Sequence, residues 1–265
     1  MYAFQFHRPS SLDDAERIFG ESDDPRYVAG GHTILPSMKL RLAAPSDIID
    51  IGDIEALKGL RVESDDVIVG AGVRHADVAR SNDVSSAIPA LADLAAMIGD
   101  FQVRNRGTLG GSIANADPAA DYPAALVGLG ATVTTNKRTI AADDYFLDLF
   151  ETALDDGELV TSVSFPKPRR AAYMKFPNPA SRYAIVGVFV AEARDGMRVA
   201  VTGAGPCVFR VAEMEAALAG SFTPEAVADI KIADDNLNSD IHAVADYRAH
   251  LITVMAKRAV AKALD

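Results

Sequence analysis

A glycine-rich stretch near the middle of the chain constrains the fold more than any other feature. It runs from Gln102 to Asp121 and reads QVRNRGTLGGSIANADPAAD. Small residues, hydroxyl groups and main-chain N–H groups are concentrated in it, and glycines let a ligand approach the backbone closely. The hydroxyls of Thr108 and Ser112 can bond phosphate oxygens. We therefore expect residues 99–121 to form a long loop that binds a pyrophosphate.

A second glycine turn lies about eighty residues earlier in the chain. A predicted strand ending at Val28 leads into Gly30 and Gly31, and a short helix with Pro36 in its first turn follows Thr33. Such a turn directs several N–H groups and the positive end of a helix toward an anion. A Gly-Gly pair alone is also typical of strand–helix turns that bind nothing. Two turns together suggest a ligand with two ends, held between two lobes.

Several classes of protein are excluded or disfavoured. The sequence contains no G-x-x-x-x-G-K-[ST] phosphate loop, and no G-x-G-x-x-G follows an N-terminal strand, so a Rossmann domain is not expected. A net charge of −11 disfavours binding to nucleic acid and to anionic lipid. The single cysteine, Cys207, excludes an internal disulfide and cannot supply the four thiolates of an iron–sulfur cluster.

No targeting or metal-binding pattern is apparent. The first nine residues lack the charged and apolar regions of a signal peptide, and no stretch is long enough for a membrane span. The five histidines do not have metal-ligand spacing. We expect a cytoplasmic protein without integral membrane association and without a metal site of its own.

Helical and strand patterns alternate along the whole chain, which indicates an α/β class. The stretch around Pro166–Pro168 is the expected domain boundary, because it is proline-flanked and basic. The predicted helices cover 12–20, 34–41, 75–80, 87–98, 122–129, 208–219 and 241–263. The predicted strands cover 25–29, 46–51, 67–72, 131–135, 159–165, 172–177, 183–193 and 197–203.

The stretch Gln102–Asp121 resembles the signature of the FAD-binding subunits of the molybdopterin dehydrogenase family. That family includes the medium chain of aerobic carbon monoxide dehydrogenase and the flavin domain of xanthine dehydrogenase. The turn at 29–33 resembles the other flavin loop of the family. Weaker similarity at 181–188, 202–205 and 246–248 extends the resemblance over nearly the whole chain.

The resemblance implies an α/β (α+β) fold with two domains. Residues 1–168 would form the two-subdomain FAD-binding fold that is shared with flavoproteins of the vanillyl-alcohol-oxidase type. Its subdomains would cover about 1–55 and 56–168. Residues 169–265 would form a C-terminal α/β domain.

The resemblance also implies a set of residues that bind FAD, and none that are catalytic or bind a metal. Both turns would hold the pyrophosphate, and Asp121 would bind polar groups of the cofactor. Leu159 and Val160 would lie along the flavin, with Lys175 near the isoalloxazine ring. The expected cofactor-binding residues are Ala29, Gly30, Gly31, His32, Thr33, Thr108, Gly110, Gly111, Ser112, Ala114, Asp121, Leu159, Val160, Lys175 and Tyr183.

Three of these candidates, and Asp117 in the glycine-rich stretch, also have a simpler interpretation. Asp117 and Asp121 could cap a helix, since Pro118 suits the first helical position. Tyr183 lies in an apolar stretch and could belong to the core. Lys175 could be a solvated surface side chain, as most lysines are.

The function implied by the resemblance is electron transfer within a multi-subunit molybdenum hydroxylase or dehydrogenase. A large subunit would carry the molybdopterin cofactor and a small subunit the iron–sulfur clusters, in an expected dimer of heterotrimers. FAD on this chain would pass electrons to an external acceptor, and the sequence names neither that acceptor nor the substrate. Two alternatives remain: a self-sufficient flavin-dependent oxidoreductase and a non-enzymatic assembly module.

Overall fold

The N-terminal lobe is built on a small parallel sheet, as the two short helices between its strands require. The computed structural model describes residues 1–265. The sheet order is β1-β3-β2, with β1 (Gln5–His7), β2 (Pro25–Val28) and β3 (Asp47–Asp50). Helices α1 (Leu12–Glu21) and α2 (Ile34–Lys39) connect the strands. Ser11 caps α1 by accepting a hydrogen bond from the Asp14 N–H at 3.2 Å.

The middle of the chain forms an antiparallel sheet of five strands in the order β4-β5-β10-β6-β7. Its strands are β4 (Leu60–Val62), β5 (Asp66–Gly70), β6 (Thr132–Thr135), β7 (Thr139–Ala141) and β10 (Val160–Pro166). The helices of this part are α3 (His75–Arg80), α4 (Asn82–Ala87), α5 (Pro89–Ala96), α6 (Phe101–Arg104), α7 (Leu109–Asn115) and α8 (Tyr122–Leu129). Short 3₁₀ turns η1 (Glu55–Leu57) and η2 (Ala142–Asp144) and the hairpin β8 (Phe146–Asp148)–β9 (Glu151–Thr152) complete it.

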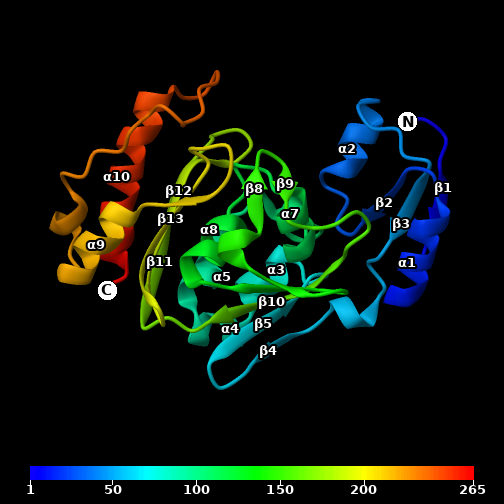
Figure 1. The fold of residues 1–265 in the computed structure, drawn as a ribbon, viewed down its shortest axis with the longest axis horizontal. Helices are drawn as coiled ribbons and strands as arrows, with labels where there is room; N and C mark the ends of the chain where they lie inside the picture. The colour runs from blue at the N-terminus through cyan, green and yellow to red at the C-terminus, as the bar shows by residue number, and fades with distance from the viewer.

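The C-terminal part is an antiparallel sheet covered by helices. Its strands, in chain order, are β11 (Arg170–Pro177), β12 (Ala184–Ala193), β13 (Gly196–Thr202) and β14 (Phe209–Arg210). Helix α9 (Ala212–Gly220), the turn η3 (Pro224–Val227) and helix α10 (Ala245–Lys262) follow. The buried residues of α10 recur every four positions and pack on β11 and β12; they include Leu251, Ile252, Met255, Ala256, Ala259 and Val260. The three sheets are arranged in a row, with the N-terminal lobe at one end (Figure 1).

Helix α8 joins the middle part to the C-terminal sheet. All eight of its residues are buried, as expected for a helix that is apolar on every side. It contacts both β12 and β13. The C-terminal sheet also binds both ends of the helix, because Lys175 pairs with Asp121 before its first turn and Arg198 donates to the Val127 carbonyl in its last turn.

The expectation of a continuous loop over 99–121 is wrong, because α6 and α7 lie within it. Thr108 caps α7 and Gly110 is buried in its first turn, where a β-carbon would lie 2.5 Å from that of Ala71. The glycine therefore permits close packing inside a helix rather than a flexible loop. The helix predicted over 87–98 is shorter, since α5 begins at Pro89. The other predicted helices and strands are confirmed to within a few residues.

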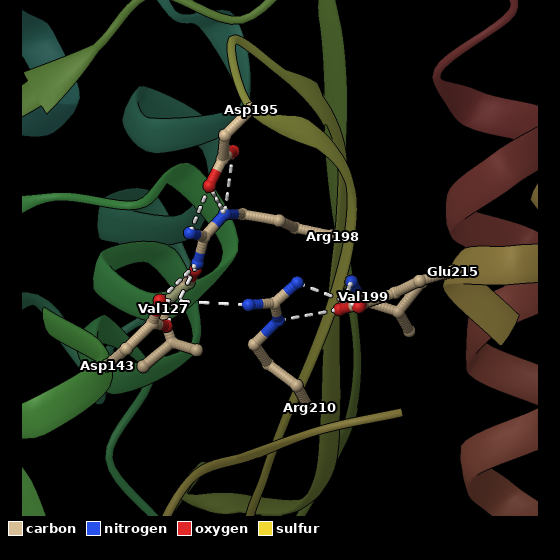
Figure 2. A network of polar contacts seen from close by, with 7 residues as sticks. All are labelled: Val127, Asp143, Asp195, Arg198, Val199, Arg210 and Glu215. Atoms are coloured by element: carbon tan, nitrogen blue, oxygen red, sulfur yellow. Dashed lines mark hydrogen bonds and ion pairs between the residues drawn. The ribbon is translucent and has the colours of Figure 1, made fainter. Parts of the chain in front are cut away.

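A polar network connects the C-terminal sheet to η2 (Figure 2). Arg198, on β13 and only 6% exposed, donates to Asp143 at 2.9 Å and to Asp195 at 3.0 Å. Arg210 forms an ion pair with Glu215 at 2.8 Å and approaches Asp143 at 3.7 Å. A buried guanidinium thus binds acceptors from η2 and from the turn between β12 and β13.

We expect Arg198→Met to destabilise this junction. The change leaves the Val127 carbonyl and Asp143 without their donor, and a lost charged hydrogen bond costs about 1–3 kcal/mol. Urea denaturation would measure the loss. Arg17→Met is the control, because Arg17 is exposed on α1 and its ion pairs are solvated. Equal losses in the two variants would contradict a structural role for Arg198.

Candidate cofactor-binding site

A cavity of about 830 Å³ lies between the N-terminal lobe and the middle of the chain. Both glycine turns line it, and the C-terminal sheet contributes the end of its β11–β12 connection. Its size lies at the upper end of the range for small-molecule sites, about 300–1,000 Å³. Every predicted cofactor-binding residue lines this cavity except Lys175.

The first turn offers main-chain donors that nothing in the protein uses. The N–H groups of Gly30, Gly31, His32 and Thr33 donate to no protein acceptor. Gly31 has φ +74°, in the left-handed region that favours glycine. Thr33 stands at the N-cap of α2 but makes no side-chain capping bond. Successive free N–H groups of this kind form a concave site for an anion.

The second turn is different from what the sequence suggested, because most of its main-chain donors are engaged. The N–H groups of Leu109 and Gly110 donate to Val73 and Ala71 at 3.0 and 2.8 Å. The Gly111 N–H donates to the Thr108 hydroxyl at 3.2 Å. The polar groups that this turn directs to a ligand are therefore chiefly hydroxyls, and that of Ser112 has no protein partner.

The glycines of the two turns have different roles. A β-carbon on Gly30 would lie 2.3 Å from the Arg106 carbonyl oxygen and 2.7 Å from the Gly107 Cα, so Gly30 lets the two turns touch. A β-carbon on Gly111 would meet only the Thr108 hydroxyl, at 2.9 Å. Gly111 is therefore the glycine whose missing side chain leaves room in the cavity.

Three arginines of the cavity have no acidic partner, although five carboxylates also line it: Asp50, Asp53, Asp117, Asp121 and Glu158. Arg74, Arg106 and Arg182 line it and form no ion pair within the chain. Unpaired guanidinium groups of this kind can pair with the phosphates of an anionic ligand. The sequence analysis did not identify Arg74 or Arg182, since isolated arginines carry no recognisable pattern.

The segment 71–75 supports the second turn, and the sequence analysis missed this role. Arg74 pairs with Thr108 as an isolated bridge, and the His75 N–H donates to the Gly107 carbonyl at 3.0 Å. The His75 ring is buried, and a β-carbon on Gly107 would lie 2.6 Å from its Nε2. Burial, aided by the charges of His32 and Arg104, lowers the pKa of His75 to about 4. The ring is thus a neutral packing surface at neutral pH.

Asp121 is held from behind by the C-terminal sheet. It is 4% exposed and accepts a hydrogen bond from the Tyr173 hydroxyl at 2.6 Å. Its ion pair with Lys175 measures 2.9 Å. Burial raises the pKa of Asp121 above its usual value, and the Lys175 charge and Tyr173 hydroxyl oppose that rise. The helix-cap interpretation of Asp121 is wrong, because its side chain makes no capping bond to α8.

Lys175 lies behind Asp121 rather than on the cavity wall. Its side chain is 3% exposed, so the solvated-surface interpretation is wrong. It also donates to the carbonyls of Met97 at 2.8 Å and Arg182 at 2.9 Å. That Lys175 lies near the isoalloxazine ring stays a prediction; in the structure these three acceptors bind its ammonium, and Lys175 does not line the cavity.

The remaining wall is largely apolar. Leu159 and Val160 enter β10 along the cavity, and the Leu159 N–H donates to Asn136 at 2.8 Å. Glu158 precedes them, and its buried carboxylate forms an ion pair at 3.0 Å with the half-exposed Arg138. Hydrogen bonding to that guanidinium, despite burial, lowers the pKa of Glu158 to about 2. Tyr183 is 45% exposed and lines the cavity, so the core interpretation is wrong.

Asp117 closes a local turn instead of capping a helix. Its carboxylate accepts a hydrogen bond from the Ala119 N–H at 2.9 Å, two residues further on. Burial raises its pKa. Asp117 also lines the cavity, beside Ala114 and Asn115.

The polar groups of the cavity fit a dinucleotide with a flat ring system. They comprise free amides, hydroxyls and arginines at the two turns, with an apolar wall at Leu159 and Val160. No group of three or more His, Cys, Asp or Glu side chains is arranged to hold a metal ion. None of the helices combines the length and apolar composition that a membrane crossing requires.

Comparison with known proteins agrees with this geometry. Residues 2–168 match the family model described as the FAD binding domain in molybdopterin dehydrogenase. Residues 171–263 match the model described as the CO dehydrogenase flavoprotein C-terminal domain. Both matches together span almost the whole chain.

Two relatives match over nearly their full length. The chain is 35% identical to the carbon monoxide dehydrogenase medium chain of Hydrogenophaga pseudoflava, over 97% of this chain and 96% of that one. It is 34% identical to the nicotine 6-hydroxylase medium subunit of Paenarthrobacter nicotinovorans, over 98% and 97% of the two chains.

A solved structure of Hydrogenophaga pseudoflava carbon monoxide dehydrogenase superposes with a TM-score of 0.92 at 36% identity, covering 99% of this chain and 98% of that one. The predicted two-part FAD-binding fold with a C-terminal α/β domain is thereby confirmed. The chain belongs to the family of FAD-binding medium subunits of the molybdopterin dehydrogenases, and is an oxidoreductase subunit whose cofactor is FAD.

Proposed function

We propose that this subunit transfers electrons from iron–sulfur clusters on a partner subunit, through FAD, to an external acceptor. The cavity lined by both glycine turns carries this proposal, because it provides one continuous site for a dinucleotide. The chain itself offers no cluster of metal-ligating side chains. Relatives named as medium chains of carbon monoxide dehydrogenase and nicotine 6-hydroxylase support a role inside a larger complex.

We assign different residues of the cavity to different parts of FAD. We assign the pyrophosphate to the free amides of Gly30–Thr33 and to the hydroxyls of Thr108 and Ser112, with the unpaired arginines nearby. We assign the apolar wall at Leu159 and Val160 to the flavin ring. When bound, FAD supplies the redox chemistry, while the protein supplies position and electrostatics.

We further propose the assembly in which this subunit works. A large subunit would hold the molybdenum cofactor, and a small subunit would hold the iron–sulfur clusters, in a dimer of heterotrimers in the cytoplasm. Within this chain the FAD-binding domain would end at Pro168, with subdomains of about 1–55 and 56–168. The separate sheets on either side of that residue support the boundary.

The isolated chain should bind FAD and oxidise no organic substrate. Heat-released cofactor should be identified as FAD by chromatography, and the loaded chain should pass electrons only to artificial acceptors when given a reductant. The reconstituted complex should oxidise its substrate and bleach the flavin absorbance. Substrate turnover by the single chain would instead establish a self-sufficient flavin oxidoreductase, and a complex that is active without FAD would establish an assembly module.

Gly111→Ala and Gly30→Ala should separate cofactor binding from folding. Gly111 does not have a positive φ, and its added methyl meets only a side-chain hydroxyl, so the fold should persist. The methyl occupies the cavity, and FAD affinity should fall by tenfold or more, which is about 1.4 kcal/mol. Fluorescence titration with FAD and urea denaturation measure the two effects.

In Gly30→Ala the methyl overlaps a backbone carbonyl that cannot rotate away. Overpacking of this kind costs about 1–3 kcal/mol, so stability should fall together with affinity. Unchanged FAD affinity in a folded Gly111→Ala chain would remove the second turn from the proposed site.

Lys175→Met should lower the free energy of unfolding, because it leaves the buried Asp121 carboxylate without its ion-pair partner. Removing one partner of a buried ion pair destabilises by about 3–5 kcal/mol. Without Lys175 the pKa of Asp121 in the folded protein should rise further above its value in the unfolded chain. The folded protein then becomes less stable as pH increases, because the buried carboxyl must ionise without a partner. The loss should therefore be larger at pH 8 than at pH 5.

Denaturation at both pH values tests this expectation. The double variant Lys175→Met/Asp121→Asn serves as the control and should recover most of the stability, because no charge is then buried. A deficit that is independent of pH and persists in the double variant would show that packing of the lysine stem, rather than charge, accounts for the effect.

A further inference from the structure

The hairpin β8–β9 carries large apolar side chains that the chain does not bury. Leu147, Leu149 and Phe150 are 53%, 54% and 57% exposed. The hairpin has only two strands and pairs with none of the three larger sheets. We define these three side chains as the apolar ridge.

Phe150 also has a backbone conformation that its side chain disfavours. It is the second of the two residues between the paired Asp148 and Glu151, and its φ is +55°. At this turn position glycine or asparagine is favoured, and a bulky residue there is strained. The Phe150 ring is therefore exposed, and its backbone conformation is unfavourable for a bulky residue. Strain of this kind is typical of functional sites, so we infer that Phe150 contacts another molecule.

A small hollow lies beside the apolar ridge. It has a volume of about 250 Å³ and lies between the middle part and the C-terminal sheet. Apolar residues (Val127, Ala142, Phe146, Val208 and Phe209) line it together with Asp143 and Arg210. Asp143 and Arg210 belong to the network between the two parts (Figure 2). Phe146 of β8 lines the hollow, and the Leu147 carbonyl lies 4.0 Å from the Cys207 sulfur, so ridge and hollow form one surface.

The rim of this surface is acidic. Residues 141–157 contain six acidic side chains and no basic one. Asp144, Asp148, Glu151 and Asp156 are exposed and form no ion pair within the chain. An apolar centre with a charged rim is the usual composition of a protein interface, and an acidic rim is complementary to a basic one.

The hairpin is coupled to the cavity wall. The Ala153 N–H donates to the Tyr145 carbonyl at 2.9 Å, which closes the base of the hairpin. Five residues later the chain reaches Glu158, Leu159 and Val160, which line the cavity. A protein docked on the ridge would thus contact a hairpin that leads directly into the segment bordering the cavity.

We propose that the apolar ridge and its hollow are the docking site for the iron–sulfur subunit, which presents an apolar surface with a basic rim. This inference rests on the proposed function, because it takes its occupant from the need for an electron donor close to the cavity. The coupling of the hairpin to the cavity wall favours the donor over the subunit that holds the substrate.

Phe150→Gly makes the test sharp, because it predicts opposite effects on stability and assembly. Glycine relieves the positive φ, so the isolated variant should unfold at a higher temperature and bind FAD as the wild type does. Affinity for the co-expressed iron–sulfur subunit should fall by about tenfold or more, as for a buried aromatic anchor. Ile241→Ser is the matched control: it removes a 94% exposed apolar side chain outside the ridge and should leave assembly unchanged.

Hydrogen exchange locates the contact surface on this chain, and cross-linking identifies the protein bound there. Amides of residues 146–151 should become protected in the assembled complex, and cross-links from Cys207 should reach the iron–sulfur subunit. Cross-links to the large subunit or to a second copy of this chain would overturn the assignment, as would unchanged assembly in Phe150→Gly. Failure of the electron-transfer proposal would look different from failure of the docking proposal. In that case the wild-type complex would still assemble through the ridge, but substrate would not reduce its flavin.

Discussion

The buried ion pair between Asp121 and Lys175 determines how the two large parts of this subunit meet. Two charges taken out of water are tolerated only when their hydrogen bonds are satisfied. Here Tyr173, Met97 and Arg182 complete the coordination. The pair lies at the start of α8, and Arg198 binds the other end of the same helix. The C-terminal sheet is therefore positioned along a fully buried helix by polar contacts at its two ends, and this position brings Tyr183 to the cavity.

The cavity depends on a second close contact, between the two glycine turns. Gly30 lies so near Arg106 and Gly107 that no β-carbon fits between them. Each turn therefore fixes the position of the other, while Gly111 leaves the space beside them free. The free amides come mainly from the first turn, and the hydroxyls from the second. One ligand that uses both sets must span the junction of the lobes, which is the geometry that a dinucleotide satisfies.

The sequence predicted the class of ligand and, apart from Lys175, residues that line a single cavity, but not the roles of individual residues. The glycine turns were recognisable because their residue types are rare in combination and specific to close backbone approach. The partners of Lys175 could not be predicted, because they come from positions 97, 121 and 182, and no local pattern shows that these residues meet. Helix α7 was missed for a related reason: Gly110 and Gly111 suggest a loop by propensity, whereas packing against Ala71 selects a helix.

The cofactor and the partner both compensate for features that weaken the isolated chain. Three unpaired arginines share one cavity, and their mutual repulsion is relieved when a dianionic pyrophosphate binds. Any ligand that binds only the folded state adds to stability by mass action. Phe150 likewise lowers the stability of the isolated chain, because its turn is strained and its ring is exposed until another protein covers it. Stability lost at these two places is thus regained through binding, so cofactor loading and assembly should both contribute to the final stability of the subunit.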